Sequence, residues 1–390
     1  MNGAKSDDRR LMHEALALAA RPARRPWPNP PVGAVVVLDG AVVGRGAHDG
    51  PGTAHAEAVA LAEAGDRARG ATLYCTLEPC NHQGLMPPCA PLVAGSGLAR
   101  LVVAMRDPNP RVAGGGLEVV RAAGIEVTVG PCAEEALDLA WPFVATRGFG
   151  RPFVWLKTAA SLDGRFAPVG MDPGAGPVYL TGEEARRQVH VLRRWADVVM
   201  VGSRTAVLDR PRLDGRLAPP GAPCPPQDPV PAVLSARLAE APPWRGRPHL
   251  AFVGPGVPAA AAASVTAAGG TVVRCAGARL GVDPSSVLAE VTRLGKQCVL
   301  VEGGPSVAAS FLGAGVVDRW IHYTAPVILG RGVGWPEVPA QALADGAGLT
   351  LTRAARCGGD ALTVWDRLPF AATCSSLAGD TAPAFDPGRA

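Results

Sequence analysis

Four residues of this chain, His55, Glu57, Cys80 and Cys89, combine types that could bind a metal ion and move a proton. A histidine and two cysteines are ligands that Zn²⁺ prefers. A catalytic zinc takes three protein ligands and leaves its fourth position to a water molecule, whose pKa falls to roughly 7. A carboxylate that does not bind the metal can act as general acid and base. The set therefore predicts a hydrolytic zinc site.

The spacing of these residues places conditions on the backbone. Residues two apart on a continuous helix point about 200° apart, so His55 and Glu57 can serve one metal only where a helix begins. Chain breakers at 50–52 and Gly65 enclose an apolar run, which predicts a helix over 53–65. The same order, His-x-Glu followed by two cysteines, occurs in zinc-dependent nucleobase deaminases, where the Glu transfers protons.

Other interpretations of the same residues stay open. Cys80 and Cys89 could be buried structural cysteines beside a surface His-Glu pair. A closed structural zinc site would take His82 as fourth ligand and leave Glu57 without a role. In that case the chain could be a non-catalytic, zinc-stabilised binding module.

Length and composition indicate a globular chain of two or three domains, since it has 390 residues of which 48% are apolar. Its 48 glycines and 39 prolines stay below the fraction typical of wholly disordered chains. Nine scattered cysteines, a polar N-terminus and no long apolar run predict a cytoplasmic location and no membrane partner. A net charge of +4 is too small for a nucleic-acid partner but suits small phosphorylated ligands.

Strands and helices are expected to alternate over the first half and to form a three-layer α/β domain, with the metal at one end of its strands. Asp39-Gly40 is a strong two-residue hairpin signal. The Gly/Arg/Pro segment 147–152 is expected to be the linker. The expected helices are 9–20, 53–65 and 117–124, and the expected strands are 32–38, 42–46, 71–76, 100–105 and 125–129. The expected domains are 1–148 and 151–370, with a mobile tail over 371–390.

The second half also alternates. Thr181 and Glu184 are expected to form a capping box that starts a helix, and 161–164 is expected to be a tight turn. The seven prolines from Pro219 to Pro231 predict a stiff loop that no helix or central strand can occupy. The other expected strands are 153–157, 197–201, 349–352, 361–365 and those near 232, 250, 271 and 297, with helices near 259 and 285.

A second site is indicated where the apolar strand 298–302 ends on Gly303-Gly304 and a helix opens at Pro305. Free N–H groups at a helix start, with glycines that allow close approach, can bind an anion such as a pyrophosphate. The segment 201–205 is a second candidate of this kind. Neither has G-x-G-x-x-G after a strand, so a Rossmann fold is not supported. The same turn could also be an ordinary strand-to-helix connection.

Two sets of motifs, in order and covering about 8–370, resemble the bifunctional riboflavin biosynthesis deaminase/reductase family. The deaminase half is matched by Asn29-Pro30-Pro31-Val32-Gly33, His48, His55 to Glu57, Thr76-Leu77-Glu78-Pro79-Cys80 and Pro87-Pro88-Cys89. The reductase half is matched by Lys157, Ser161 to Gly164, Thr181-Gly182, Ala185-Arg186, Leu192-Arg193, Val201-Gly202, Thr205, Asp209, Pro211, Leu213, Arg216 and Val301-Glu302-Gly303-Gly304-Pro305.

The resemblance implies a cytidine-deaminase-like zinc domain followed by a dihydrofolate-reductase-like domain that uses NADPH. The substrate would be a phosphorylated pyrimidine, deaminated first and then reduced at its ribosyl group, and the chain would be a homo-oligomer. In the first domain Glu57 would be catalytic, the metal ligands would be His55, Cys80 and Cys89, and the substrate contacts would be Asn29, His48 and His82. In the second domain the substrate would contact Tyr179, Arg193, Leu213, Arg216 and Glu302, and NADPH would contact Ala160, Thr181, Thr205, Asp209, Gly304, Pro305 and Ser306.

The chain departs from the family pattern at several positions. Leu85 and Met86 stand where the family has Lys or Arg followed by Thr, so a phosphate contact is expected to be missing there. The other departures are Arg210, Asp214 and Ser235-Ala236. One alternative is a zinc deaminase of another nucleobase fused to a divergent or inactive reductase-like domain. The eight residues between the two cysteines, rather than two, disfavour it.

Overall fold

The computed structural model describes residues 2–109, 112, 115–170, 178–238, 242–336, 348–367 and 377–378. These residues divide into two compact units. The first contains Met1–Gly150 and Gly221–Pro226, and the second contains Arg151–Pro220 and residues 227–367. Except for Leu377 and Ala378, which belong to the first unit, the tail expected over 371–390 lies outside the described residues.

The first unit is built on a five-stranded sheet in the order β2-β1-β3-β4-β5. β1 is antiparallel to β2 and β3, whereas β3, β4 and β5 are parallel. Positive φ angles of 50° and 78° at Asp39 and Gly40 confirm the expected two-residue turn between β1 and β2. The elements of this unit are α1 (Asn2–Ala19), β1 (Gly33–Leu38), β2 (Ala41–Ala47), α2 (Ala56–Ala64), a 3-10 turn (Gly65–Ala68), β3 (Thr72–Cys75), α3 (Cys89–Ala94), β4 (Arg100–Val103), α4 (Gly115–Ala122), β5 (Glu126–Val129) and α5 (Ala133–Phe149).

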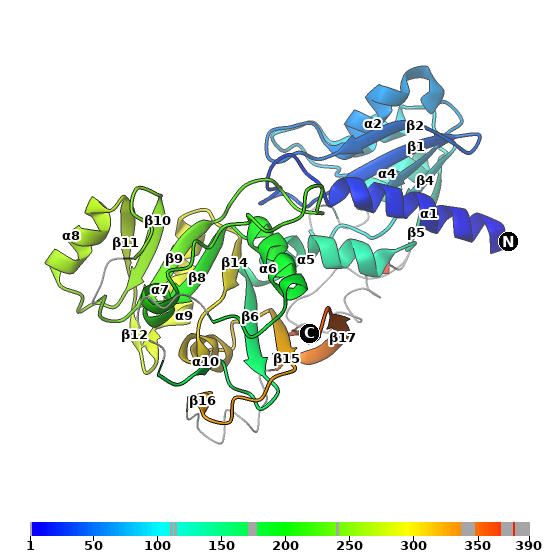
Figure 1. The fold of residues 1–390 in the computed structure, drawn as a ribbon. Helices are drawn as coiled ribbons and strands as arrows, with labels where there is room; N and C mark the ends of the chain where they lie inside the picture. The colour runs from blue at the N-terminus through cyan, green and yellow to red at the C-terminus, as the bar shows by residue number, and fades with distance from the viewer. Residues whose placement is uncertain are drawn as a thin grey trace. The chain divides into compact units, whose positions relative to one another are not determined.

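Two glycines place helices on both faces of this sheet (Figure 1). A Cβ atom at Gly33 would collide with the backbone of Ala15 in α1, and one at Gly46 would collide with the backbone of Ala56 in α2. Gly46 pairs with Ala34, the neighbour of Gly33, so the two glycines face opposite sides of the pleated sheet. α1 and α2 therefore pack on opposite faces, which confirms the expected three layers.

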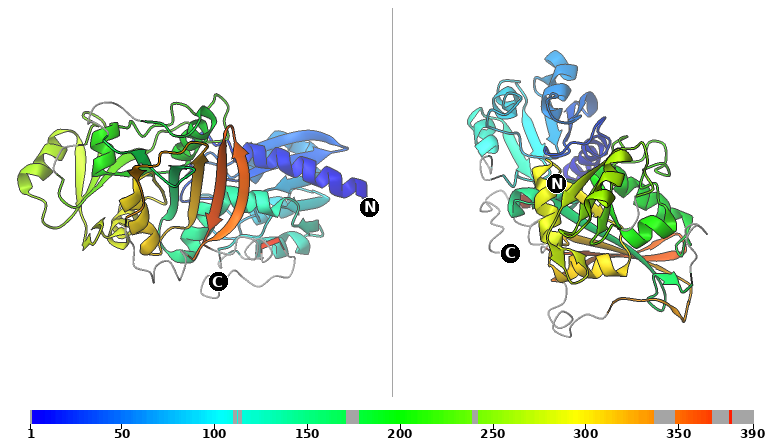
Figure 2. Two further views of the ribbon diagram at one scale, coloured as in Figure 1. Left: turned by 60° about the horizontal axis from the view of Figure 1, so that its bottom comes forward. Right: turned by 90° about the vertical axis from the view of Figure 1, so that its left-hand side faces the viewer.

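The second unit is built on a nine-stranded sheet in the order β11-β10-β9-β8-β14-β6-β15-β18-β17. All neighbours are parallel from β11 to β15, and β18 and β17 follow as an antiparallel hairpin. Figure 1 shows α8 beside β10 and β11 at one edge, and Figure 2 shows the orange hairpin at the other. The elements are β6 (Phe153–Ser161), β7 (Ala167–Pro168), α6 (Glu183–Trp195), β8 (Val198–Gly202), α7 (Ser203–Asp209), β9 (Val230–Ser235), β10 (His249–Val253), α8 (Ala259–Ala267), β11 (Gly270–Arg274), β12 (Gly277–Ala278), β13 (Gly281–Val282), α9 (Pro284–Arg293), β14 (Cys298–Val301), α10 (Pro305–Gly313), β15 (Arg319–Ala325), β16 (Gly332–Val333), β17 (Thr350–Cys357) and β18 (Asp360–Asp366).

The inner strands β8, β10 and β14 are apolar along their whole length, apart from His249 in β10. Every residue of β8, β10 and β14 is buried. This continuous pattern is typical of parallel sheets. The core between the layers includes the large side chains of Phe252 and Phe311.

Three expectations from the sequence were wrong in detail. The helix α5, which was not expected, continues to Phe149, so the linker does not begin at Arg147. Thr181 does not cap α6, whose N-cap is Gly182. The Gly182 N–H instead donates to the carboxylate of Asp360 at 2.8 Å, a residue far away in the sequence.

Pro231 lies in β9, an interior strand of the sheet. The proline-rich segment that includes it was expected to contain no helix and no central strand. The preceding N–H, from Val230, donates to Asp197 beside β8. The nitrogen of Pro231 therefore faces β10, where pairing begins only at Ala232. No ladder hydrogen bond is lost, which is why proline is tolerated at this position.

No helix among the described residues combines the length and apolar character that crossing a membrane requires.

Candidate functional site

The first candidate site lies where three chain segments of the first unit meet. His55 is the N-cap residue of α2, Cys89 is the first residue of α3, and Cys80 follows β3. The His55 Nδ1 atom is 3.2 Å from the Cys89 Sγ atom and 3.5 Å from the Cys80 Sγ atom. All three potential ligand atoms lie within 4.8 Å of one another. The structure thus brings together the three residues expected to bind metal.

The geometry of these three residues fits a tetrahedral zinc ion. Usual Zn–N and Zn–S bond lengths imply N···S separations of about 3.6 Å between two ligands of one zinc. A hydrogen bond from the Cys89 thiol, followed by one from His55, lowers the pKa of Cys80 to about 4, against the effect of burial. The same contact with Cys80 raises the pKa of Cys89. The pair therefore favours one thiolate, the form that binds a metal.

Glu57 lies in the first turn of α2, and only 4% of its surface is exposed. Burial raises its pKa to about 7, and its carboxyl group contacts the Cys89 thiol. A buried carboxyl with this pKa can both accept and donate a proton near neutral pH. The sequence expectation that Glu57 stands beside the metal ligands agrees with this position.

A cavity of about 150 Å³ opens next to His55, Glu57 and Cys80, and the residues expected to contact the pyrimidine line it. Asn29 Nδ2 is 3.0 Å from His48 Nε2, and His48 Nδ1 is 3.3 Å from the carbonyl oxygen of Ala54. Because a carbonyl only accepts, Nδ1 carries the proton and Nε2 accepts from the amide. Burial lowers the pKa of His48, which favours the neutral ring. His82 lines the same cavity.

Several lining residues of this cavity were not among the expected site residues. Asp107 and Asn109 follow β4, and Phe143 and Arg147 come from α5. β4 lies beside β3 and parallel to it, so the residues that follow both strands share one sheet edge. That rule could have identified Asp107 and Asn109 from the sequence. Arg147 could not be found, because it was placed in the linker.

Glu78 holds the segment that carries Cys80 against its neighbours. Its buried carboxylate accepts the N–H groups of Asp107 at 3.2 Å, Gly116 at 3.0 Å and Leu117 at 3.3 Å. The last two N–H groups belong to the first turn of α4 and have no partner within the helix. One carboxylate therefore ties the loops after β3 and β4 to the start of a helix.

A second group of metal-ligand types, His13, Cys132 and Glu135, lies on α1 and α5. His13 Nε2 is 3.4 Å from Glu135 Oε1, and the guanidinium of Arg9 lies at the same distance from that oxygen. Half of the His13 side chain and nearly half of the Glu135 side chain are exposed. A cation of the protein already occupies the carboxylate, and we assign no metal to this group.

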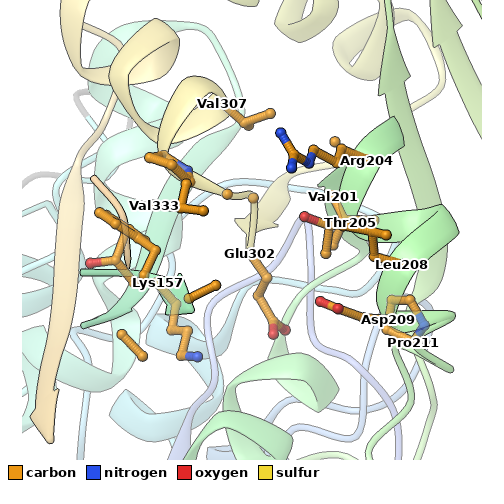
Figure 3. A pocket seen from close by; sticks show the side chains of 18 of the residues that line it. Lys157, Val201, Arg204, Thr205, Leu208, Asp209, Pro211, Glu302, Val307 and Val333 are labelled. Atoms are coloured by element: carbon orange, nitrogen blue, oxygen red, sulfur yellow. The ribbon is translucent and has the colours of Figure 1, made fainter. Parts of the chain in front are cut away.

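The second candidate site is a cavity of about 1020 Å³ in the second unit. Figure 3 shows Lys157 from β6 on one side of it, Thr205 and Asp209 from α7 on the other, and Glu302 between them. Ala160 is buried in β6 and does not line this cavity. The other eleven residues expected to contact substrate or NADPH do line it: Tyr179, Thr181, Arg193, Thr205, Asp209, Leu213, Arg216, Glu302, Gly304, Pro305 and Ser306.

The arrangement of adjacent strands explains why distant segments share this cavity. β8 and β14 are parallel neighbours, and each ends in a short turn that leads into a helix. Both turns therefore lie at the same edge of the sheet. α10 begins at Pro305 with Gly304 as its N-cap, and Gly303 is so close to Val307 that a Cβ atom there would collide with it. Close backbone approach at a helix start is suited to binding an anion.

Buried charged residues that line this cavity interact with one another. Arg193 donates from Nε to Glu302 Oε1 at 2.6 Å and from Nη2 to Oε2 at 2.9 Å, and the two side chains are only 11% and 8% exposed. Burial acts to raise the pKa of Glu302, but Arg193 and then Lys157 outweigh it and lower that pKa. Burial lowers the pKa of Lys157, and Glu302 opposes this. The guanidinium fork of Arg193, which was expected to contact the substrate, thus faces Glu302.

Arg216, the other arginine expected to contact the substrate, is 40% exposed and makes an ion pair with the buried carboxylate of Asp214 at 2.5 Å. Arg212 contacts the same carboxylate at 2.9 Å. Burial acts to raise the pKa of Asp214, but Arg216 outweighs it and lowers that pKa. Asp214, one of the departures noted in the sequence, therefore positions Arg216 at the cavity wall.

The fold and the two sites define a two-domain α/β enzyme, a zinc-deaminase-like domain followed by a reductase-like domain. Residues 5–105 match the family described as "Cytidine and deoxycytidylate deaminase zinc-binding region", and residues 152–363 match the "RibD C-terminal domain". The chain is 35% identical to the riboflavin biosynthesis protein RibD of Aquifex aeolicus over 376 residues, 92% of this chain and 98% of that protein. It is 37% identical to RibD of Escherichia coli over 334 residues, 83% of this chain and 89% of that protein.

Solved structures similar to this chain come from the same family as these relatives. The diaminohydroxyphosphoribosylaminopyrimidine deaminase/5-amino-6-(5-phosphoribosylamino)uracil reductase of Thermotoga maritima has a TM-score of 0.74 and 28% identity, with 93% of this chain and 99% of that chain covered. RibD of Acinetobacter baumannii has a TM-score of 0.71 and 29% identity, with the same coverage. The chain belongs to the RibD family, the bifunctional deaminases and reductases of riboflavin biosynthesis.

Proposed function

We propose that the first unit hydrolyses the 2-amino group of 2,5-diamino-6-(5-phosphoribosylamino)pyrimidin-4-one and releases ammonia. The second unit then reduces the ribosyl group of the product to ribityl with NADPH, and the 5-phosphate is kept. The observation that carries this proposal is the convergence of His55, Cys80 and Cys89 beside the buried Glu57, at a cavity of about 150 Å³.

In the deaminase, His55, Cys80 and Cys89 would hold Zn²⁺, which supplies a water molecule activated at neutral pH when it is bound. The carboxyl group of Glu57 would take up a proton and deliver it to the departing amino group. Its burial keeps this proton transfer away from bulk solvent. Asn29 and His48, which hydrogen-bond to each other and line the same cavity, would orient the pyrimidine.

In the reductase, a nicotinamide cofactor supplies the hydride, and the chain must align it with the sugar in a dry pocket. The cavity is large enough for a dinucleotide and a second ligand, and the start of α10 offers free N–H groups for a pyrophosphate. Gly304, Pro305, Ser306, Thr205, Thr181 and Asp209 would hold NADPH. Arg216 would bind the substrate phosphate, and Glu302, fixed by Arg193 and near Lys157, would face the sugar.

We assign residues 1–148 to the deaminase domain and residues 151–370 to the reductase domain. The division between the compact units at Gly150 and Arg151 supports this assignment. The phosphorylated pyrimidine is the proposed small-molecule partner, and the homo-oligomer and the cytoplasmic location stay predictions from the sequence.

The proposal is tested by incubating the purified zinc-loaded protein with the diaminopyrimidine phosphate and following ammonia release and NADPH oxidation. We expect ammonia with or without NADPH, and NADPH oxidation only after deamination. Glu57→Gln should keep its zinc and lose about 10²- to 10⁴-fold in ammonia release. It should still oxidise NADPH when the deaminated intermediate is supplied. A Gln variant that deaminates at the wild-type rate would exclude Glu57 from the mechanism.

A further inference from the structure

The deaminase cavity must accept a phosphate dianion, because the proposed substrate carries a 5-phosphate. Among the described residues that line this cavity, Arg147 is the single arginine or lysine. The loop that borders the cavity contributes Leu85, with 82% of its surface exposed, and Met86. These side chains offer no donor to a phosphate. Among the described residues that line the cavity, the cation for the phosphate is therefore Arg147, which lies in α5.

The guanidinium of Arg147 is available for a ligand. It lies 5.4 Å from the ring centroid of Phe143, one helical turn earlier in α5, and both residues line the cavity. No ion pair or hydrogen bond engages this guanidinium within the described part of the chain. Stacking on an aromatic face restricts an arginine side chain without using any of its five N–H donors. The position is thus prepared for a planar, two-point contact with phosphate oxygens.

The carboxyl group of Asp107 is the group that competes with a phosphate for the guanidinium of Arg147. Asp107, which follows β4, also lines the cavity, and burial raises its pKa to about 7, while Arg147 acts in the opposite direction. The charge of Arg147 therefore acts on the carboxyl group of Asp107. Only 7% of Asp107 is exposed, and one of its carboxylate oxygens accepts the N–H of Asn109 at 2.8 Å. Its carboxyl group is committed to the loop and leaves the donors of Arg147 free.

We infer that Arg147 binds the 5-phosphate of the pyrimidine substrate in the deaminase domain and so determines its preference for the phosphorylated form. The inference rests on the proposed deaminase function. It places a substrate-binding residue on α5, the helix that ends just before the second unit begins. It also accounts for an apolar residue at position 85, because the cation is supplied by another element.

The test compares ammonia release from the phosphorylated substrate and from the same compound without its phosphate. Arg147→Leu should raise KM for the phosphorylated substrate roughly tenfold to hundredfold and leave KM for the other compound unchanged. It should weaken competitive inhibition of ammonia release by inorganic phosphate. Leu85→Lys in the Arg147→Leu background should restore a large part of the loss, because it returns a cation to the cavity border. Arg10→Leu, at an exposed arginine of α1 paired with Asp7, is the matched control.

Zinc content and urea unfolding of each variant establish that it is folded. Equal KM values for wild type and Arg147→Leu on the phosphorylated substrate would overturn the inference and leave the deaminase function intact. A rise that is the same for both compounds, or that Leu85→Lys does not relieve, would show that Arg147 only stabilises the end of α5 or Asp107. Absence of ammonia release from the wild type would instead defeat the proposed function itself.

Discussion

At the scale of single residues, two of the three proposed zinc ligands lie where helices begin. His55 and Cys89 both stand at the start of a helix, where backbone N–H groups have no partner within the helix. The positive end of a helix stabilises a thiolate, which favours the metal-binding form of Cys89 when zinc is present. This position also resolves the spacing problem: His55 precedes the first helical turn, so it can face the cysteines while Glu57 faces the cavity.

The assignment of Cys89 as a ligand gives a first prediction. Cys89→Ser should lose zinc and ammonia release together, because a serine hydroxyl is a far weaker zinc ligand than a thiolate. Metal analysis of the purified variant checks this. Cys132→Ser is the matched control, since it removes another buried cysteine that has His and Glu neighbours. We expect the Cys132→Ser control to keep one zinc per chain. If Cys132→Ser lost zinc and Cys89→Ser kept it, the metal would bind at His13, Cys132 and Glu135 instead.

A second prediction concerns Arg216 in the reductase cavity. Asp214 holds this guanidinium at the cavity wall, and its exposed part can contact a phosphate. Arg216→Ala should raise KM for the phosphorylated substrate by about tenfold to hundredfold and change KM for NADPH much less. Steady-state kinetics with each substrate varied in turn checks this, with Arg187→Ala, at an exposed ion pair of α6, as control. Loss of NADPH binding with intact substrate binding would show that the two sites are exchanged.

At the scale of elements, α6 carries a histidine that makes stability depend on pH. His190 is 5% exposed, and its Nδ1 atom is 3.3 Å from the N–H of Leu217. Burial, with Arg193 and Arg216, lowers its pKa from 6.5 to about 4. Above pH 6.5 the ring is neutral in the folded and the unfolded chain, and the stability is fully present. Between pH 6.5 and pH 4 only the unfolded chain takes up the proton, so the free energy of unfolding falls by about 3 kcal/mol in total.

The measurement is urea unfolding of the second unit at pH 7 and pH 5, for wild type and His190→Gln. A glutamine keeps an acceptor for Leu217 but does not titrate. The wild type should lose about 2 kcal/mol more than the variant between these two pH values. Parallel losses in the two proteins would mean that His190 is protonated equally in the folded and the unfolded state.

Local signals in the sequence predicted most of these elements, and long-range contacts explain the exceptions. The turn at Asp39-Gly40 and the strand-to-helix turn at Gly303-Gly304 depend on their own residues, and both are confirmed. The start of α6 depends on Asp360, and the tolerance of Pro231 depends on where β10 begins pairing. No sequence window contains those partners.

The candidate sites follow the same division. His55, Glu57 and Cys80 could be predicted because their types and spacing carry the chemistry. Arg147 was missed because glycines and Pro152 after it suggested a linker, whereas α5 continues to Phe149. The packing of α5 within the first unit determines where this helix ends, and its residues Leu137 and Val144 are fully buried there. The pairing of Arg193 with Glu302 joins residues 109 positions apart, which no local pattern encodes.

At the scale of the whole molecule, each unit has its own sheet and its own core. β1 to β5 form one sheet, and the strands of the nine-stranded sheet all come from β6 onwards. Of the described residues between 151 and 367, only Gly221–Pro226 group with the first unit, and they lie in the proline-rich segment outside any helix or strand. No strand of the second unit would therefore lose its pairing if the first unit were removed.

The last prediction is that residues 151–370 form an autonomous reductase. The fragment keeps all nine strands, the cavity of about 1020 Å³ and the buried pair of Arg193 and Glu302, so folding should not require the deaminase. It should unfold cooperatively in urea and oxidise NADPH when the deaminated intermediate is supplied, at a rate unaffected by zinc chelation. The matched control is the full-length Glu57→Gln protein, which retains the first unit without its deamination. An unfolded fragment, or one that reduces its substrate only when the first unit is added, would show that the reductase cavity depends on residues before Arg151.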